Sequence, residues 1–167
     1  MAVVTTKSTQ IGNRDSTPRV FSNGRVNGAP VQTARGVLAT VNGDSIASKY
    51  IFCSIPSNAV PISVRVTSPD IGTTTVGDVG LYKNTEDGGA VVDADFFASA
   101  LSVSGGALSK SEILYESGVV TIANGEKTVW EILALTADSK LMYDVVMTLT
   151  AAADAAASLM IEVDYTI

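Results

Sequence analysis

Apolar and polar residues alternate most regularly in the last part of the chain, from residue 141 to residue 167. Every odd position between residues 141 and 149 is apolar, and the same holds between 159 and 167. A repeat of two residues is typical of strands that bury one face. Because only residues 150–158, mostly alanine, separate the two stretches, we expect two strands that pair with each other antiparallel.

Each of these two strands has an apolar face that a second layer of structure must cover. Val145 and Ile161 lie in the middle of the apolar rows, so we place them in the core. Asp144 and Glu162 are their neighbours in sequence and are predicted to lie on the outer faces, since successive strand residues point to opposite sides.

Shorter alternating stretches predict further strands. They are expected at residues 36–41, 49–55, 62–66, 74–82, 113–115 and 119–122. In the third of these, Ile62, Val64 and Val66 alternate with polar residues and are predicted to share a half-buried strand. Gly77 and Gly80 interrupt the side-chain rows of the fourth, and glycine inside a strand often marks a bulge or a close backbone contact.

Two short helices are predicted in the long connections. The first would begin at Asp93 and Asp95, whose carboxylates suit a helix N-terminus, with Phe97, Ala100 and Leu101 following at helical spacing. The second would begin near Asn124, with one apolar face that holds Val129, Ile132 and Leu133.

These elements predict a mainly β fold. The expected architecture is an antiparallel β-sandwich or jelly roll, with two short helices in connections and an extended N-terminal arm. The arm would span residues 1–32 and the β-sandwich body residues 33–167. More than half of the first 32 residues are Gly, Ser, Thr, Asn, Gln or Pro, so this segment cannot bury enough surface by itself to offset its ordering entropy.

Charge divides the chain at almost the same place. Residues 1–35 hold five basic residues and one acidic residue, a net charge of +4, whereas residues 36–167 hold six basic and sixteen acidic residues, a net charge of −10. A basic arm on an acidic body indicates a binding role for the arm. We therefore predict partner contacts by Arg14, Arg19, Arg25 and Arg35.

The composition excludes most catalytic and metal chemistry. The chain has no histidine and a single cysteine, Cys53, so Ser-His-Asp and Cys-His catalysis and His- or Cys-based zinc sites cannot be built. No Walker A, G-x-G-x-x-G or G-x-S-x-G motif occurs. Cys53 alternates within an apolar strand and is predicted to be a buried, inert thiol. We expect no enzyme activity and no cofactor.

Two groups of carboxylates remain as candidate sites. Asp87, Asp93 and Asp95 could converge on a calcium ion, although their spacing does not fit an EF-hand loop. The favoured interpretation is a solvated loop followed by a capped helix, and therefore no metal. Glu112 and Glu116 could form a glycosidase-like pair, but such pairs arise by chance in acidic proteins.

Neither nucleic acid nor a membrane is expected as a partner. The basic residues of the arm are few and widely spaced, and phosphates would repel the acidic body. No apolar run approaches the roughly 18 residues of a membrane span.

Several short strings together resemble a family of phage proteins. They are Ile55-Pro-Ser-Asn-Ala-Val60, Val79-Gly-Leu-Tyr82, Gly88-Gly-Ala-Val-Val-Asp-Ala-Asp95-Phe-Phe-Ala-Ser-Ala-Leu101, Val129-Trp-Glu-Ile-Leu133 and Tyr143-Asp-Val-Val146, and more loosely Thr17-Pro-Arg-Val20 in the arm. In this combination the chain resembles the head decoration, or cement, proteins of tailed bacteriophages, which bind the outside of the assembled capsid.

The resemblance implies a β-sandwich body and a structural role without catalysis. The expected location is the capsid exterior of a virion, after synthesis in the host cytoplasm. The expected partners are the major capsid protein and copies of the chain itself, with a trimer favoured over a dimer because closed cyclic oligomers suit a symmetric lattice. The alternative is a carbohydrate-binding or fibre- or tail-associated jelly-roll module, since jelly rolls also occur in lectins.

Overall fold

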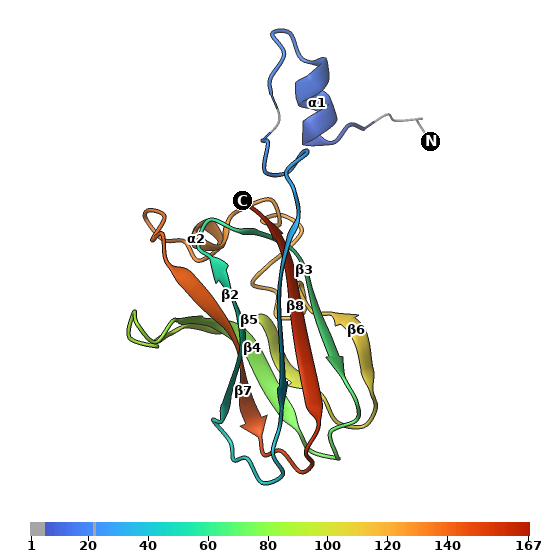
Figure 1. The fold of residues 1–167 in the computed structure, drawn as a ribbon. Coiled ribbons are helices and arrows are strands. Elements are labelled where there is room, and N and C mark those ends of the chain that lie inside the picture. The colour runs from blue at the N-terminus through green and yellow to red at the C-terminus, as the bar shows by residue number, and fades with distance from the viewer. Residues whose placement is uncertain (1–5, 22) are drawn as a thin grey trace.

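The body consists of two four-stranded antiparallel sheets packed face to face (Figure 1). The structure is a computed structural model that describes residues 6–21 and 23–167. The strands are β1 (Gln32–Ala39), β2 (Lys49–Pro56), β3 (Val60–Ser68), β4 (Val76–Lys83), β5 (Val91–Ser102), β6 (Leu108–Glu112), β7 (Met142–Ala151) and β8 (Ser158–Thr166).

The strand order is β1-β8-β3-β6 in one sheet and β2-β7-β4-β5 in the other. This is the order of an eight-stranded jelly roll, in which two Greek keys are wrapped into a sandwich. The edge strands β1 and β2 come close together, because Gly36 has no side chain: a Cβ atom there would lie 1.9 Å from the Phe52 carbonyl oxygen. The predicted mainly β sandwich is therefore confirmed.

The two predicted terminal strands are confirmed as β7 and β8, but their predicted pairing is wrong. β7 lies between β2 and β4, whereas β8 lies between β1 and β3 in the opposite sheet. Residues 152–157 cross between the sheets at the end of the body away from the arm (Figure 1). Asp154 holds this crossing, since its carboxylate accepts hydrogen bonds from the N–H and hydroxyl of Thr73, both at 2.8 Å, and from the Thr75 hydroxyl at 3.1 Å. Packed sheets are only about 10 Å apart, so a short connection can join them.

The facing sides of β7 and β8 form the middle of the core. Val145 and Ile161 are fully buried, as predicted. Glu162 points to the other side of its strand but is also buried, which corrects the prediction of a solvent-facing residue. The reason is its position on a central strand, directly between Arg35 of β1 and Arg65 of β3.

The predicted helix from Asp93 is wrong, because this segment is the bulged strand β5. Four residues of β5, 94–97, oppose Gly80 alone on β4. A Cβ atom at Gly80 would lie 2.1 Å from the Asp93 carbonyl oxygen, so the glycine lets the bulge pass over β4. The bulge buries both Phe96 and Phe97, whose rings pack edge to face with centroids 4.9 Å apart. Tertiary packing here overrides the local helical pattern.

The long connection between β6 and β7 contains turns and one short helix. Residues 113–115 and 119–122, predicted as strands, lie in turns, bends and irregular backbone instead, although Ile113, Leu114 and Val120 still contribute to the core. The predicted second helix begins later than expected, as α2 (Val129–Ile132). Glu131 stabilises its start by accepting a hydrogen bond from the Thr128 N–H at 2.9 Å.

Residues 6–21 and 23–31 form an arm, most of which stands away from the body (Figure 1). The arm is not extended throughout, because it contains the helix α1 (Thr9–Asp15), none of whose residues is buried. The arm meets the body at Arg25, whose carbonyl oxygen accepts a hydrogen bond from the Thr166 hydroxyl at 2.9 Å. Within the described residues, neither helix is long and apolar enough to cross a bilayer.

Candidate functional site

Arg14 is exposed on α1 but is paired within the arm. Its Nε lies 2.7 Å from Asp15 Oδ1, and Lys7 Nζ lies 2.9 Å from Asp15 Oδ2. The hydrogen bond to Asp15 raises the pKa of Arg14, and the same bond lowers the pKa of Asp15. These pairs are solvent-exposed and contribute little to stability, so a partner with a better-placed carboxylate can compete for Arg14.

The other predicted arginines lie in three different places. Arg19 is exposed on the arm just after α1, and Arg25 is exposed where the arm meets the body. Arg35 lies in β1 and therefore belongs to the body, where its Nη1 is 3.6 Å from Glu162 Oε1. The structure thus brings none of the four side chains together in one cluster.

Arg35 belongs to a charged network on the outer face of the β1-β8-β3-β6 sheet. Arg65 Nη2 donates to Asp164 Oδ2 at 2.6 Å, and the Thr33 hydroxyl donates to Asp164 Oδ1 at 2.6 Å. Among the described residues, Arg65 Nε and Glu162 Oε2 are buried without a hydrogen-bond partner. Charged groups that are buried and incompletely paired are costly, so these two atoms lower the stability that the network gives to this face.

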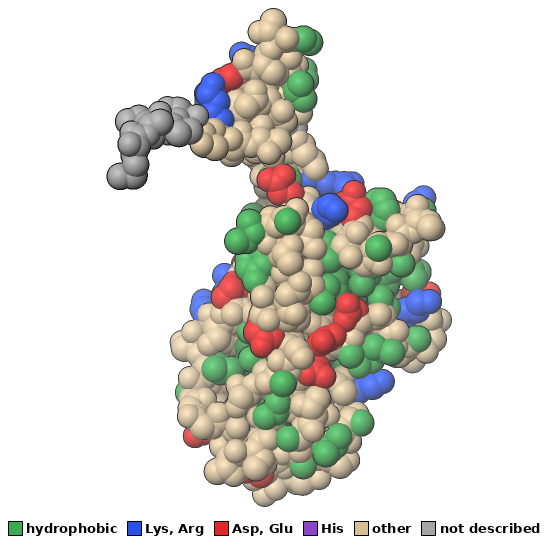
Figure 2. Space-filling model, turned by 180° about the vertical axis from the view of Figure 1, so that it is seen from behind, with side chains coloured by type: hydrophobic (Ala, Val, Ile, Leu, Met, Phe, Trp, Pro, Cys, Tyr) green, Lys and Arg blue, Asp and Glu red, His purple; other side chains and the backbone are tan. Residues whose placement is uncertain are grey.

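Acidic side chains gather over the middle of the body in the rear view (Figure 2). In the same view, basic side chains stand on the arm, near its junction with the body and along the flanks of the body (Figure 2). The body, to which the sequence assigns most of the acidic residues, shows several of them together on this face. An acidic partner surface would meet the arm more favourably than the body.

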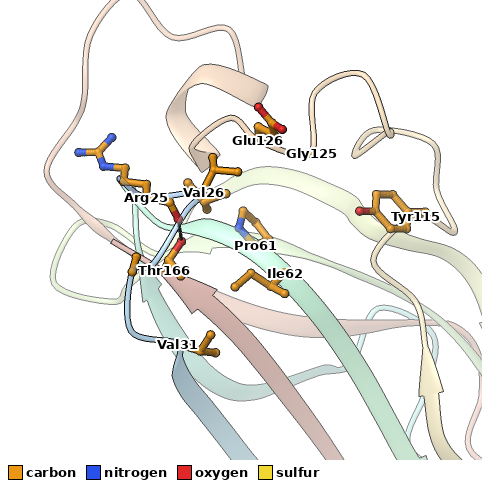
Figure 3. A pocket seen from close by; sticks show the side chains of 11 residues that line it. Arg25, Val26, Val31, Pro61, Ile62, Tyr115, Gly125, Glu126 and Thr166 are labelled. Carbon is orange, nitrogen blue, oxygen red and sulfur yellow. Dashed lines mark hydrogen bonds between the residues drawn. The ribbon is translucent and has the colours of Figure 1, made fainter. Parts of the chain in front are cut away.

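A hollow of about 280 Å³ lies where the arm joins the body (Figure 3). We call it the arm-base groove, and it is lined by Arg25, Val26, Ala29, Val31, Val60, Pro61, Ile62, Tyr115, Gly125, Glu126 and Thr166. Its walls are mainly apolar, with one acidic group, Glu126, at the rim. In Figure 3 the guanidinium of Arg25 extends away from the apolar side chains.

A β-bulge aims Ile62 into this groove. Pro61 is opposite Tyr165 and Ser63 is opposite Asp164, so Ile62 is an extra residue on β3. Bulges re-aim side chains, and Ile62 is 45% exposed where regular alternation would bury it with Val64. Because the bulge depends on how β3 pairs with β8, the alternation in the sequence does not predict the groove. The local signal for it is Pro61, since proline in strands is common at bulges.

Comparison with known proteins finds a similarity of structure. No family model matches the chain, and no curated protein matches it. A chain of the solved structure "Cyanophage Pam1 capsid asymmetric unit" has a similar fold, with a TM-score of 0.57 and 18% sequence identity. The alignment covers 89% of this chain and 93% of that chain. At this identity the similarity is evidence for a shared fold.

The candidate calcium ligands do not form a site. Asp93 and Asp95 lie in β5, and the Asp95 N–H donates to Asp93 Oδ1 at 3.3 Å, whereas Asp87 lies in the preceding loop. Burial and the neighbouring Asp95 raise the pKa of Asp93. Across residues 6–21 and 23–167, no group of three or more His, Cys, Asp or Glu residues could hold a metal ion.

The two glutamates considered as a catalytic pair have structural partners. Glu112 accepts hydrogen bonds from the N–H groups of Val64 and Leu114, at 2.8 and 3.0 Å, and Glu116 accepts one from the Ser99 N–H at 2.6 Å. Both carboxylates therefore satisfy backbone donors in β3, in β5 and in the connection after β6. These hydrogen bonds give both glutamates a structural role.

Cys53 is partly buried in β2. Burial, together with the nearby Asp144 carboxylate, raises the pKa of its thiol to about 12. Because the thiolate is the reactive form, such a thiol is a poor nucleophile at neutral pH.

Proposed function

We propose that this chain is a non-enzymatic structural protein of a virion, which binds the outer surface of a tailed-phage capsid and stabilises it. The observation that carries the proposal is the jelly-roll body, whose fold is similar over most of its length to a chain from a phage capsid structure. The resemblance to decoration proteins that the sequence carries points in the same direction. The exposed arm supports the proposal as well, because it adds a binding surface to the compact body.

The arm is suited to bind a protein surface. Arg14, Arg19 and Arg25 are exposed along it. The planar guanidinium makes paired hydrogen bonds with carboxylates, and it is only weakly hydrated, so it loses little water when it binds. Exposed ion pairs contribute only about 0–1 kcal/mol each. Several copies acting together, with a trimer as the expected assembly, would strengthen such weak contacts through effective concentration. The major capsid protein is the proposed partner.

The test is co-sedimentation of the full chain with capsids that lack their native decoration protein, followed by cryo-electron microscopy of the particles. We expect saturable binding and added density at regular positions across the shell. Replacing Arg14, Arg19 and Arg25 together by alanine should weaken binding in part, and the loss should be greatest at low salt, where electrostatic contacts are least screened. Density restricted to the tail or fibres, together with glycan binding by the body, would favour the carbohydrate-binding alternative instead.

A further inference from the structure

The arm has an apolar pair, Val20 and Phe21, that residues 6–21 and 23–167 leave exposed. Phe21 is 90% exposed and Val20 is 50% exposed. A phenylalanine is among the side chains that gain most from burial, so an exposed Phe21 next to an exposed Val20 is a candidate contact surface. The neighbouring helix α1 has no buried residue and so provides no core for it.

The turn after α1 presents this pair outward. The Val20 N–H donates to the Asn13 carbonyl oxygen and to the Ser16 hydroxyl, both at 3.2 Å. The Ser16 hydroxyl in turn donates to the Asn13 carbonyl oxygen at 2.7 Å. These bonds fasten Val20 to the C-terminal end of α1, so the pair is held away from the body of its own chain.

The arm-base groove offers the complementary surface. Ile62 and Tyr115 are 45% and 50% exposed in its walls, and Val31 is also exposed. A dry apolar cavity of about 150 Å³ accommodates a benzene molecule. The groove, at about 280 Å³, therefore has room for the ring of Phe21 and part of Val20.

Charge favours the same match. Glu126 at the rim is approached only by the neutral amide of Gln10, at 3.3 and 3.4 Å, among the described residues. Arg19 directly precedes Val20, so docking of the apolar pair would bring a guanidinium to this rim. An arginine–carboxylate bond is stronger than the long amide contact that it would replace.

We infer that the arm-base groove of one copy receives the Arg19-Val20-Phe21 segment of a second copy. The exchange would leave α1 and Arg14 free for another surface. It links the proposed assembly to specific residues, but it requires only the free protein and does not depend on capsid binding.

The test is disulfide trapping between two distinguishable full-length chains, with Cys53→Ala in both to remove the native thiol. One chain carries Val20→Cys, which keeps the ring of Phe21, and the other carries Ile62→Cys; the two are mixed at high concentration and oxidised. We expect a mixed disulfide, roughly ten-fold more abundant than with the control partner Ile46→Cys, because docking raises the effective concentration of the two thiols. Ile46 is a suitable control since it is also exposed, at 63%, and lies in the loop between β1 and β2 outside the groove.

A second measurement guards against an effect of the cysteines themselves. Sedimentation velocity of full-length Phe21→Asp should show weaker self-association than the unchanged chain, and Ile46→Asp should show no change. Equal trapping of both partners, no trapping, or trapping only within a single chain that carries both cysteines would overturn the inference. Capsid co-sedimentation is a separate result, so failure of one proposal is distinguishable from failure of the other.

Discussion

The arm and the body of this protein are stabilised in different ways. The body buries a continuous apolar core between two sheets, to which every strand except β1 and β6 contributes buried apolar side chains. The arm has a helix without any buried residue, and its hydrogen bonds are mostly between near neighbours in sequence. Local bonds alone hardly offset the entropy of ordering a chain. The difference teaches that the body is stabilised by its own core, whereas the arm has no core, and this is the basis for proposing a partner for the arm.

The largest expected effect is in the body, at Val145. Val145→Asp would place an unpaired charge in the centre of the core and cost several kcal/mol, comparable to the whole stability of a domain. We expect an unfolded or insoluble protein by circular dichroism. Asp144→Ala, on the other face of β7, is the control and should cost about 1 kcal/mol through loss of the hydrogen bond from the Ser54 hydroxyl. A folded Val145→Asp protein would contradict the core described above.

Removal of the arm separates the two regions directly. A chain that lacks residues 1–32 should remain a folded, mainly antiparallel β body. Its free energy of unfolding should fall by about 1–3 kcal/mol, because the deletion removes the bond between Arg25 and Thr166, the contacts of Gln10 with Glu126 and the first residue of β1. Its binding to capsids should fall strongly. Thermal melting and co-sedimentation measure the two effects. Capsid binding as tight as that of the full chain would mean that the arm is not the anchor.

Two glycine substitutions sharpen the comparison. Gly80→Ala should destabilise the body by about 1–3 kcal/mol, because the new methyl group would clash with the backbone of β5. Gly12→Ala meets no atom within 4 Å in α1 and should favour that helix by up to about 1 kcal/mol. Denaturant unfolding should detect the first change and miss the second. A shift of the main transition by Gly12→Ala would indicate that the arm folds together with the body.

The smallest effect concerns two carboxylates with lowered pKa values. Hydrogen bonds from Thr73 lower the pKa of Asp154 to about 2, so its stabilising contribution is present above the ordinary carboxyl pKa near 3.9 and is lost as the pH falls toward 2. Asp154→Asn should therefore lower the melting temperature at pH 7, and the difference from the unchanged chain should shrink toward pH 2. Asp15→Asn, in the arm, should leave the melting temperature unchanged at both pH values.

Alternation in the sequence was sufficient for the two terminal strands and for their buried faces, because a period of two residues is a local property. Composition changes near residue 32, and the boundary between arm and body that it predicts stays a prediction. The absence of histidine and the single cysteine limited the possible chemistry from the start. These inferences needed no knowledge of which strand meets which.

Tertiary structure alone decided which strands pair and which residues depart from the alternating pattern of burial. The connection of residues 152–157 could have formed a hairpin or a crossing between sheets, and packing of the two apolar faces against each other selected the crossing. The bulges that bury Phe96 and Phe97 together and turn Ile62 outward depend on the neighbouring strands, β4 and β8. Glu162 is buried because of the arginines beside it in the sheet. Each of these outcomes depends on residues far apart in the chain, which a local pattern cannot bring together.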